Sequence, residues 1–127
     1  MERGRKMTEN SYKTPCGFIH YFVNIIDKQK ITLVFLPGLT ADHRLFEKQT
    51  EYFENKQNVF LWDAPSHALS RPFTNNYSLS DMAEWLDEIL IKEEIYYPII
   101  IGQSMGGYQA QMYMELYPDK IKGFISI

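Results

Sequence analysis

The sequence predicts an α/β fold, with a mostly parallel sheet and helices on both of its faces. Short apolar runs of strand length alternate along the chain with segments whose apolar residues recur at helical spacing. One such run, residues 99–101, leads through Gly102-Gln-Ser104-Met-Gly106 into a helical pattern, which is the order of a strand, a sharp turn and a helix. The 127 residues are 45% hydrophobic, enough to build the core of a single domain.

Composition and charge exclude several classes of protein. The net charge is −3 and the basic residues are scattered, so we expect neither a nucleic-acid-binding nor an anionic-membrane surface. The single cysteine, Cys16, excludes an internal disulfide framework, cannot form a zinc site alone, and favours the cytoplasm. No apolar window approaches the length of a membrane span or of a signal peptide's core. We expect a soluble protein with a disordered leader over residues 1–10 and one domain over residues 11–127.

The first part of the domain predicts two strands and a helix. Residues 18–23 and 31–36 are apolar runs of strand length. His20 lies within the first of them, and a lone histidine in a strand is expected to be a packed or half-exposed residue rather than a ligand or base. Asp42 is a candidate N-cap for a helix over residues 44–54, whose apolar positions roughly follow a 3.6-residue stripe.

The middle of the chain predicts a third strand and a second helix. Residues 58–62 form another buried strand, which closes in a turn at Asp63-Ala-Pro65 and continues as a loop to residue 76. Ser78 and Asp81 then have the spacing of a capping box. The apolar positions that follow fit one face of a helix: Leu79, Met82, Ala83, Leu86, Ile89 and Leu90.

The C-terminal part predicts a strand, a helix and a final strand. The fourth buried strand begins at Pro98, the helical pattern spans residues 107–117, and Pro118 stops it. Residues 121–127 then start one more apolar strand. In a parallel sheet wound on both faces, a helix should follow and cover this strand, and none follows here.

The sharp turn at Ser104 carries the chemistry. Such a turn holds its central residue in a strained conformation that lifts the hydroxyl clear of the backbone, and Gly102 and Gly106 provide room because they lack a Cβ atom. The first helical N–H, that of Met105, points to where negative charge would develop on a substrate oxygen. The alternative interpretation is a glycine-rich turn with an idle serine.

Three landmarks occur in order after successive strands: Leu36-Pro-Gly-Leu-Thr40, Asp63-Ala-Pro-Ser-His-Ala-Leu-Ser70 and Gly102-Gln-Ser-Met-Gly106. Together they resemble the α/β-hydrolase superfamily, whose third landmark is the nucleophile elbow. The resemblance covers nearly the whole chain. In the first landmark Pro-Gly replaces the usual His-Gly, and in the second Ser66 and Ala68 stand where glycines are usual, which keeps a tight turn possible at some cost in strain.

The resemblance implies a role for each matching residue. Ser104 would be the nucleophile, and the backbone N–H groups of Met105 and Leu39 would form the oxyanion hole. Asp63 would have a structural role in holding its loop. The hole is made by main chain, so the loss of the usual histidine before Gly38 should matter little. No cofactor or metal is implied.

The resemblance also implies that part of the catalytic machinery is missing. His43 and His67 lie near the carboxyl ends of predicted strands, the edge where open α/β sheets bind ligands. In this superfamily, however, the order along the chain is serine, acid, histidine. After Ser104 there is no histidine, and the one aspartate, Asp119, reads as a solvated turn residue. We therefore expect a fold truncated after about the sixth strand, with the strand at residues 123–127 left as an apolar edge.

The function so implied is that of a serine hydrolase, which cleaves an ester or thioester of a small to medium carboxylic acid through a Ser104 acyl-enzyme. Lipase, peptidase and lyase chemistry remain open. Haloalkane dehalogenase chemistry is disfavoured, because resemblance to that class of enzyme would require an aspartate at position 104. Two alternatives remain. In the first, the chain is a catalytically silent fragment or interaction module. In the second, it is a hydrolase-derived receptor that binds a small molecule with little turnover.

Overall fold

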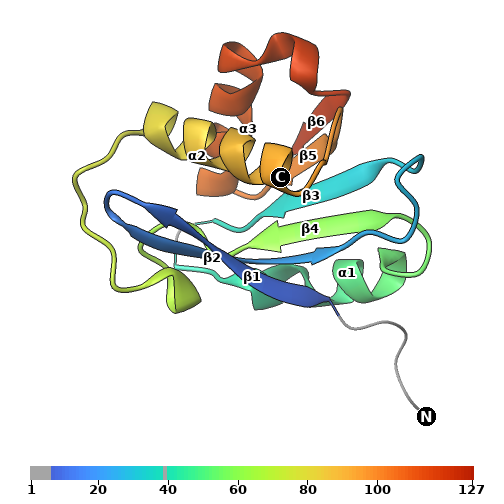
Figure 1. Cartoon of the computed structure of the whole chain (residues 1–127), viewed down its shortest axis with the longest axis horizontal. Helices are drawn as coiled ribbons and strands as arrows, with labels where there is room; N and C mark the ends of the chain where they lie inside the picture. The colour runs from blue at the N-terminus through green and yellow to red at the C-terminus, as the bar shows by residue number, and fades with distance from the viewer. Residues whose placement is uncertain (1–6, 39) are drawn as a thin grey trace.

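The computed structural model describes residues 7–38 and 40–127, and its described strands form one six-stranded sheet in the order β1-β2-β4-β3-β5-β6 (Figure 1). The four strands from β4 to β6 in that order are parallel, whereas β1 and β2 pair antiparallel. The predicted α/β fold with a mostly parallel sheet is confirmed. The strands are β1 (Thr8–Thr14), β2 (Gly17–Asn24), β3 (Thr32–Leu36), β4 (Asn58–Trp62), β5 (Ile99–Gly102) and β6 (Gly123–Ser126).

Helices cover both faces of the sheet (Figure 1). On one face, α2 (Leu79–Lys92) and α3 (Met105–Leu116) bury apolar side chains against the larger core cluster. On the other face, the 3₁₀ turn η1 (His43–Phe46) leads into α1 (Glu47–Phe53), and Phe46 packs in a second cluster with β3 and β4. Two short 3₁₀ turns complete the described elements, η2 (Ala68–Ser70) and η3 (Pro118–Lys120). Within these described parts, no helix has the length and apolar character needed to cross a membrane.

Two helix starts are confirmed in atomic detail. The carboxylate of Asp42 accepts the backbone N–H of Arg44 at 2.8 Å, so Asp42 is the predicted N-cap, although the helix expected over residues 44–54 begins as the tighter turn η1. At α2 the capping box is complete. The Ser78 hydroxyl accepts the Asp81 N–H at 3.1 Å, and the Asp81 carboxylate accepts the Ser78 N–H at 2.9 Å.

The expected leader over residues 1–10 is wrong for residues 8–10, which belong to β1. Residues 1–6 lie outside the described part of the chain. The strand is easy to overlook because most of its side chains are exposed and polar, so it lacks an apolar run. Its position comes from backbone pairing with β2 along its whole length, and from Tyr12, which packs against the larger core cluster.

The last strand lies where the sequence predicts it. β6 pairs only with β5 in the described sheet and forms its edge. Ile125 within β6 is 52% exposed, and Ile127 just after it is 69% exposed. An apolar strand at an open edge is a site where further chain can pair.

A phenol–carboxylate hydrogen bond joins β1 to α2, and we expect its contribution to stability to depend on pH. The Tyr12 hydroxyl donates to Glu88, and this carboxylate raises the pKa of Tyr12 from 10.0 to about 12. Because the folded pKa lies above the unfolded one, the contribution to stability is fully present below pH 10 and is lost as pH rises towards 12. We expect ultraviolet titration of the folded chain to show a tyrosine that ionises near pH 12. Tyr12→Phe should remove it, and an unchanged titration curve in that variant would contradict the assignment.

Candidate active site

Ser104 lies at the bend between β5 and α3. Its backbone has φ 55° and ψ −117°, a conformation that is strained for any residue other than glycine. The residue is exposed, and its hydroxyl has no hydrogen-bond partner among the described residues. The predicted strand, sharp turn and helix are therefore confirmed, and the turn presents a free hydroxyl at the carboxyl end of a parallel strand.

Two glycines allow the bend to form. A Cβ atom on Gly102 would lie 2.2 Å from the carbonyl oxygen of Gly106, and a Cβ atom on Gly106 would lie 1.9 Å from the carbonyl oxygen of Leu36. Both contacts are with backbone, which cannot move aside as a flexible side chain can. The strand β5, the helix α3 and the end of β3 thus lie so close together that only glycine fits at these two positions, as predicted.

The main chain around Ser104 has one prominent free donor. The N–H of Gln103 donates to the Leu36 carbonyl at 3.1 Å, and the N–H of Ser104 donates to the Ile127 carbonyl at 3.0 Å. Met105 is the first residue of α3, so its N–H has no acceptor within the helix. This N–H therefore lies next to the hydroxyl, at the helix end that favours negative charge.

Leu39, the second expected oxyanion donor, lies outside the described residues. The residue before it is close to the bend: a Cβ atom on Gly38 would lie 3.0 Å from the Cβ atom of Ser104. After Leu39 the loop is closed by the N–H of Ala41, which donates to the Gly38 carbonyl at 3.1 Å. The loop that contains residue 39 thus starts against the serine.

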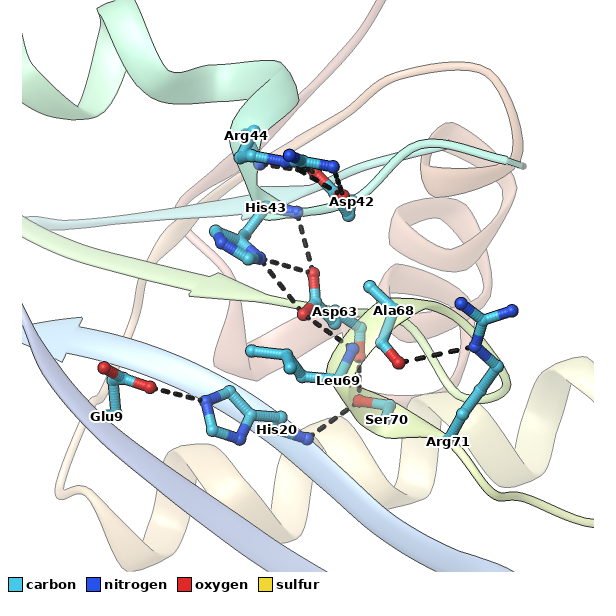
Figure 2. A network of polar contacts seen from close by, with 10 residues as sticks. All are labelled: Glu9, His20, Asp42, His43, Arg44, Asp63, Ala68, Leu69, Ser70 and Arg71. Carbon is cyan, nitrogen blue, oxygen red and sulfur yellow. Dashed lines mark hydrogen bonds and ion pairs between the residues drawn. The ribbon is translucent and has the colours of Figure 1, made fainter.

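A buried aspartate holds the far end of this loop (Figure 2). Asp63 follows β4 and is 0% exposed. One carboxylate oxygen accepts the backbone N–H of His43 at 2.7 Å and lies 2.9 Å from its ring Nδ1, and the other accepts the N–H of Leu69 at 3.2 Å. The Ser70 hydroxyl donates to the Asp63 carbonyl at 2.6 Å and accepts the N–H of His20 at 2.8 Å. Asp63 therefore joins the loop after β3 to the loop after β4.

The pairing of His43 with Asp63 could not be seen in the sequence. The two residues are 20 positions apart, and the only signal is that each lies shortly after one of two adjacent parallel strands. The His43 ring also packs on the Phe22 ring, with centroids 4.4 Å apart. His20, as expected, is half-buried in β2, with its ring 3.1 Å from the exposed carboxylate of Glu9.

Neither candidate histidine is bonded to the serine in the described structure. His43 is bound to Asp63, and Nδ1 of His67 lies 3.1 Å from the carbonyl oxygen of Pro65. Asp119 is an exposed residue of η3, in line with the prediction of a turn residue. Among the described His, Cys, Asp and Glu side chains, no group of three or more could hold a metal ion. Among the described residues, the bend thus brings together a free hydroxyl and the first N–H of a helix, and no histidine is bonded to that hydroxyl.

The two residues that stand where glycine is usual in the second landmark are strained. Ser66 has φ 75° and Ala68 has φ 45°, the left-handed region that favours glycine. The predicted cost in strain at these positions is confirmed. The strain is opposed by local bonds, because the Ser66 hydroxyl bonds the Tyr77 hydroxyl at 2.8 Å and the side-chain carbonyl of Asn75 at 3.1 Å.

Comparison with known proteins gives the chain a family. Residues 31–127 match the family model described as the alpha/beta hydrolase fold. A Mycoplasma genitalium protein named as an esterase/lipase is 26% identical over 102 residues, which are 79% of this chain and 38% of that protein. The chain therefore spans well under half of the length of this relative.

Solved structures share the fold across almost the entire chain. A bacterial membrane phospholipase A matches with a TM-score of 0.82 at 20% identity, over 95% of this chain and 39% of its own. Est816, an N-acyl homoserine lactone degrading enzyme, matches with a TM-score of 0.85 at 19% identity, over 93% of this chain and 44% of its own. Naproxen esterase from Bacillus subtilis matches with a TM-score of 0.82 at 19% identity, over 95% of this chain and 42% of its own. With residues 31–127 matched by the family model, the chain belongs to the α/β-hydrolase fold family.

Proposed function

We propose that this chain is the nucleophile-bearing part of a serine hydrolase, which cleaves an ester or related acyl bond through an acyl-enzyme on Ser104. One observation carries the proposal. The exposed Ser104 hydroxyl stands at a strained bend directly before Met105, the first residue of a helix, whose N–H has no acceptor within that helix. A nucleophile next to a fixed backbone donor is the minimum arrangement for acyl transfer.

In the proposed reaction, Oγ of Ser104 attacks the carbonyl carbon of the substrate and its proton passes to a base. The carbonyl oxygen becomes an oxyanion, which accepts hydrogen bonds from the N–H groups of Met105 and Leu39. The leaving alcohol departs with a proton, and a water molecule then hydrolyses the acyl-enzyme. We assign the base and the acid to the region of the full-length relatives that this chain does not span, because it covers only 38–44% of their lengths.

Relatives that are named as esterases and lipases support a carboxylic ester or thioester as the substrate class. The free thiol of Cys16 supports a reducing compartment, and we propose the cytoplasm. A second candidate, a catalytically silent module, is favoured by one specific observation. Among the described residues, no histidine is hydrogen-bonded to the serine.

A fluorophosphonate probe on the 127-residue chain tests the proposal. We expect labelling at Ser104, lost in Ser104→Ala, when imidazole is added as the base, because the bend presents the hydroxyl and the Met105 N–H lies beside the developing charge. Ser11→Ala is the matched control, since Ser11 is also exposed, lies in β1 and should not affect labelling. A folded chain, verified by circular dichroism, that is not labelled at Ser104 in the presence of imidazole would overturn the enzymatic proposal and favour the silent module.

A further inference from the structure

A polar hollow lies beside the candidate active site, between the loop after β3 and the loop after β4. Its volume is about 390 Å³, a size that accepts small ligands. Both loops leave the carboxyl ends of parallel strands, the same edge of the sheet as Ser104. The hollow is lined by Thr40, Ala41, Asp42, Ser66, His67, Ala68 and Arg71.

Arg71 supplies the hollow with donors that the described protein does not use. Its Nε donates to the carbonyl oxygen of Ala68 at 3.4 Å, as Figure 2 shows. Neither terminal nitrogen of the guanidinium has an acceptor among the described residues. His67 lines the same hollow, and its Nδ1 already lies 3.1 Å from the carbonyl oxygen of Pro65.

The acidic groups nearby do not cancel this positive charge. Asp42 is the one acidic residue lining the hollow, and its carboxylate is bonded to Arg44 at 2.7 Å from Nη2 and 3.1 Å from Nε. Asp42 and Arg44 thus form an ion pair, and its hydrogen bonds hold the pKa of Asp42 below its ordinary value. Asp63 is fully buried beneath the loops and bonded to His43. The guanidinium of Arg71 is thus the uncompensated charge that faces the hollow.

We propose that this hollow binds a carboxylate of the substrate, so that Arg71 selects esters which carry a second, anionic group. The inference rests on the proposed function of Ser104. A guanidinium with two free terminal nitrogens matches a carboxylate in a two-bond fork. β3 separates β4 from β5, so the ends of those two strands are about 10 Å apart. Ala41 lines the hollow and donates to the carbonyl of Gly38, the residue packed against Ser104, so the hollow and the serine are neighbours and a short half-ester of a diacid suits the pair.

A binding experiment separates this inference from turnover. Isotope-labelled 127-residue chain is titrated with monomethyl glutarate and, in parallel, with uncharged dimethyl glutarate, while amide shifts are followed by NMR. We expect the monoester to bind more tightly, and Arg71→Gln to weaken its affinity about tenfold or more, because hydrogen bonds to a charged group are lost. Affinity for the diester should stay unchanged. Lys48→Gln, an exposed cation on α1, is the control and should change neither affinity.

Each outcome decides for or against the site. Equal affinity for monoester and diester, or an unchanged affinity in Arg71→Gln, overturns the inference. Arg71→Lys keeps the charge without the fork and should retain part of the preference, which keeps the test decisive if the glutamine variant fails to fold. Ser104→Ala should bind the monoester normally. If Arg71-dependent binding persists while fluorophosphonate labelling is absent, the hydrolase proposal fails and the carboxylate site stands. If Ser104 is labelled but binding does not depend on Arg71, the carboxylate site is refuted and the hydrolase proposal stands.

Discussion

Gly106→Ala is expected to destabilise the fold by about 3 kcal/mol or more, because the new methyl group has no space. Its Cβ atom would lie 1.9 Å from the carbonyl oxygen of Leu36 and 2.8 Å from the carbonyl carbon. Both atoms form the Leu36 carbonyl at the end of β3, whose oxygen also accepts the Gln103 N–H. Relief therefore requires α3 to move away from the sheet, which also displaces Ser104. Urea denaturation of the chain measures the loss.

Gly123→Ala is the matched control for this substitution. Gly123 lies in β6, and no atom is found within 4 Å of the position that its Cβ would occupy. An alanine there should change the free energy of unfolding by less than about 1 kcal/mol, with a gain from reduced freedom of the unfolded chain. Equal stability of the Gly106 and Gly123 variants would show that the bend is not as tightly packed as described.

Asp63→Ala is expected to cost about 3–5 kcal/mol, because it removes the acceptor for a buried group of donors. The N–H groups of His43 and Leu69 and the His43 ring all bond this carboxylate. Asp63→Asn keeps one acceptor oxygen and replaces the other with an amino group, so it should cost about 1–3 kcal/mol. Thermal and urea unfolding measure both values, and amide hydrogen exchange at residues 40–43 should accelerate in the alanine variant.

The control for Asp63 is Asp119→Asn, a substitution of an exposed aspartate in η3 that should stay within about 0.5 kcal/mol of the parent. A loss of stability in Asp63→Ala without faster exchange at residues 40–43 would contradict the proposed link between the two loops. The aspartate would then stabilise only its own loop, through Leu69 and Ser70.

Local pattern was sufficient where a segment is either uniformly buried or capped. The strands β3 and β4 and the capped helix α2 are in the predicted places because continuous apolar runs and the Ser78–Asp81 box are local signals. β1 was missed because its side chains are mostly polar and exposed, so that only its partner strand makes it a strand. The helix after Asp42 was placed correctly but begins as a 3₁₀ turn, and only the fold shows that Asp63 accepts the first N–H of that turn, from His43.

For the site, the sequence by itself determined the serine and its bend. A buried strand, a glycine on each side of Gln103-Ser104-Met105 and a following helix leave little choice of geometry, because larger residues would collide with the backbone. Only the tertiary structure decided which groups surround the serine. The His43–Asp63 bond and the charge of Arg71 facing the hollow depend on the order of β4, β3 and β5 in the sheet. That order is set by the packing of distant segments, and no local spacing encodes it.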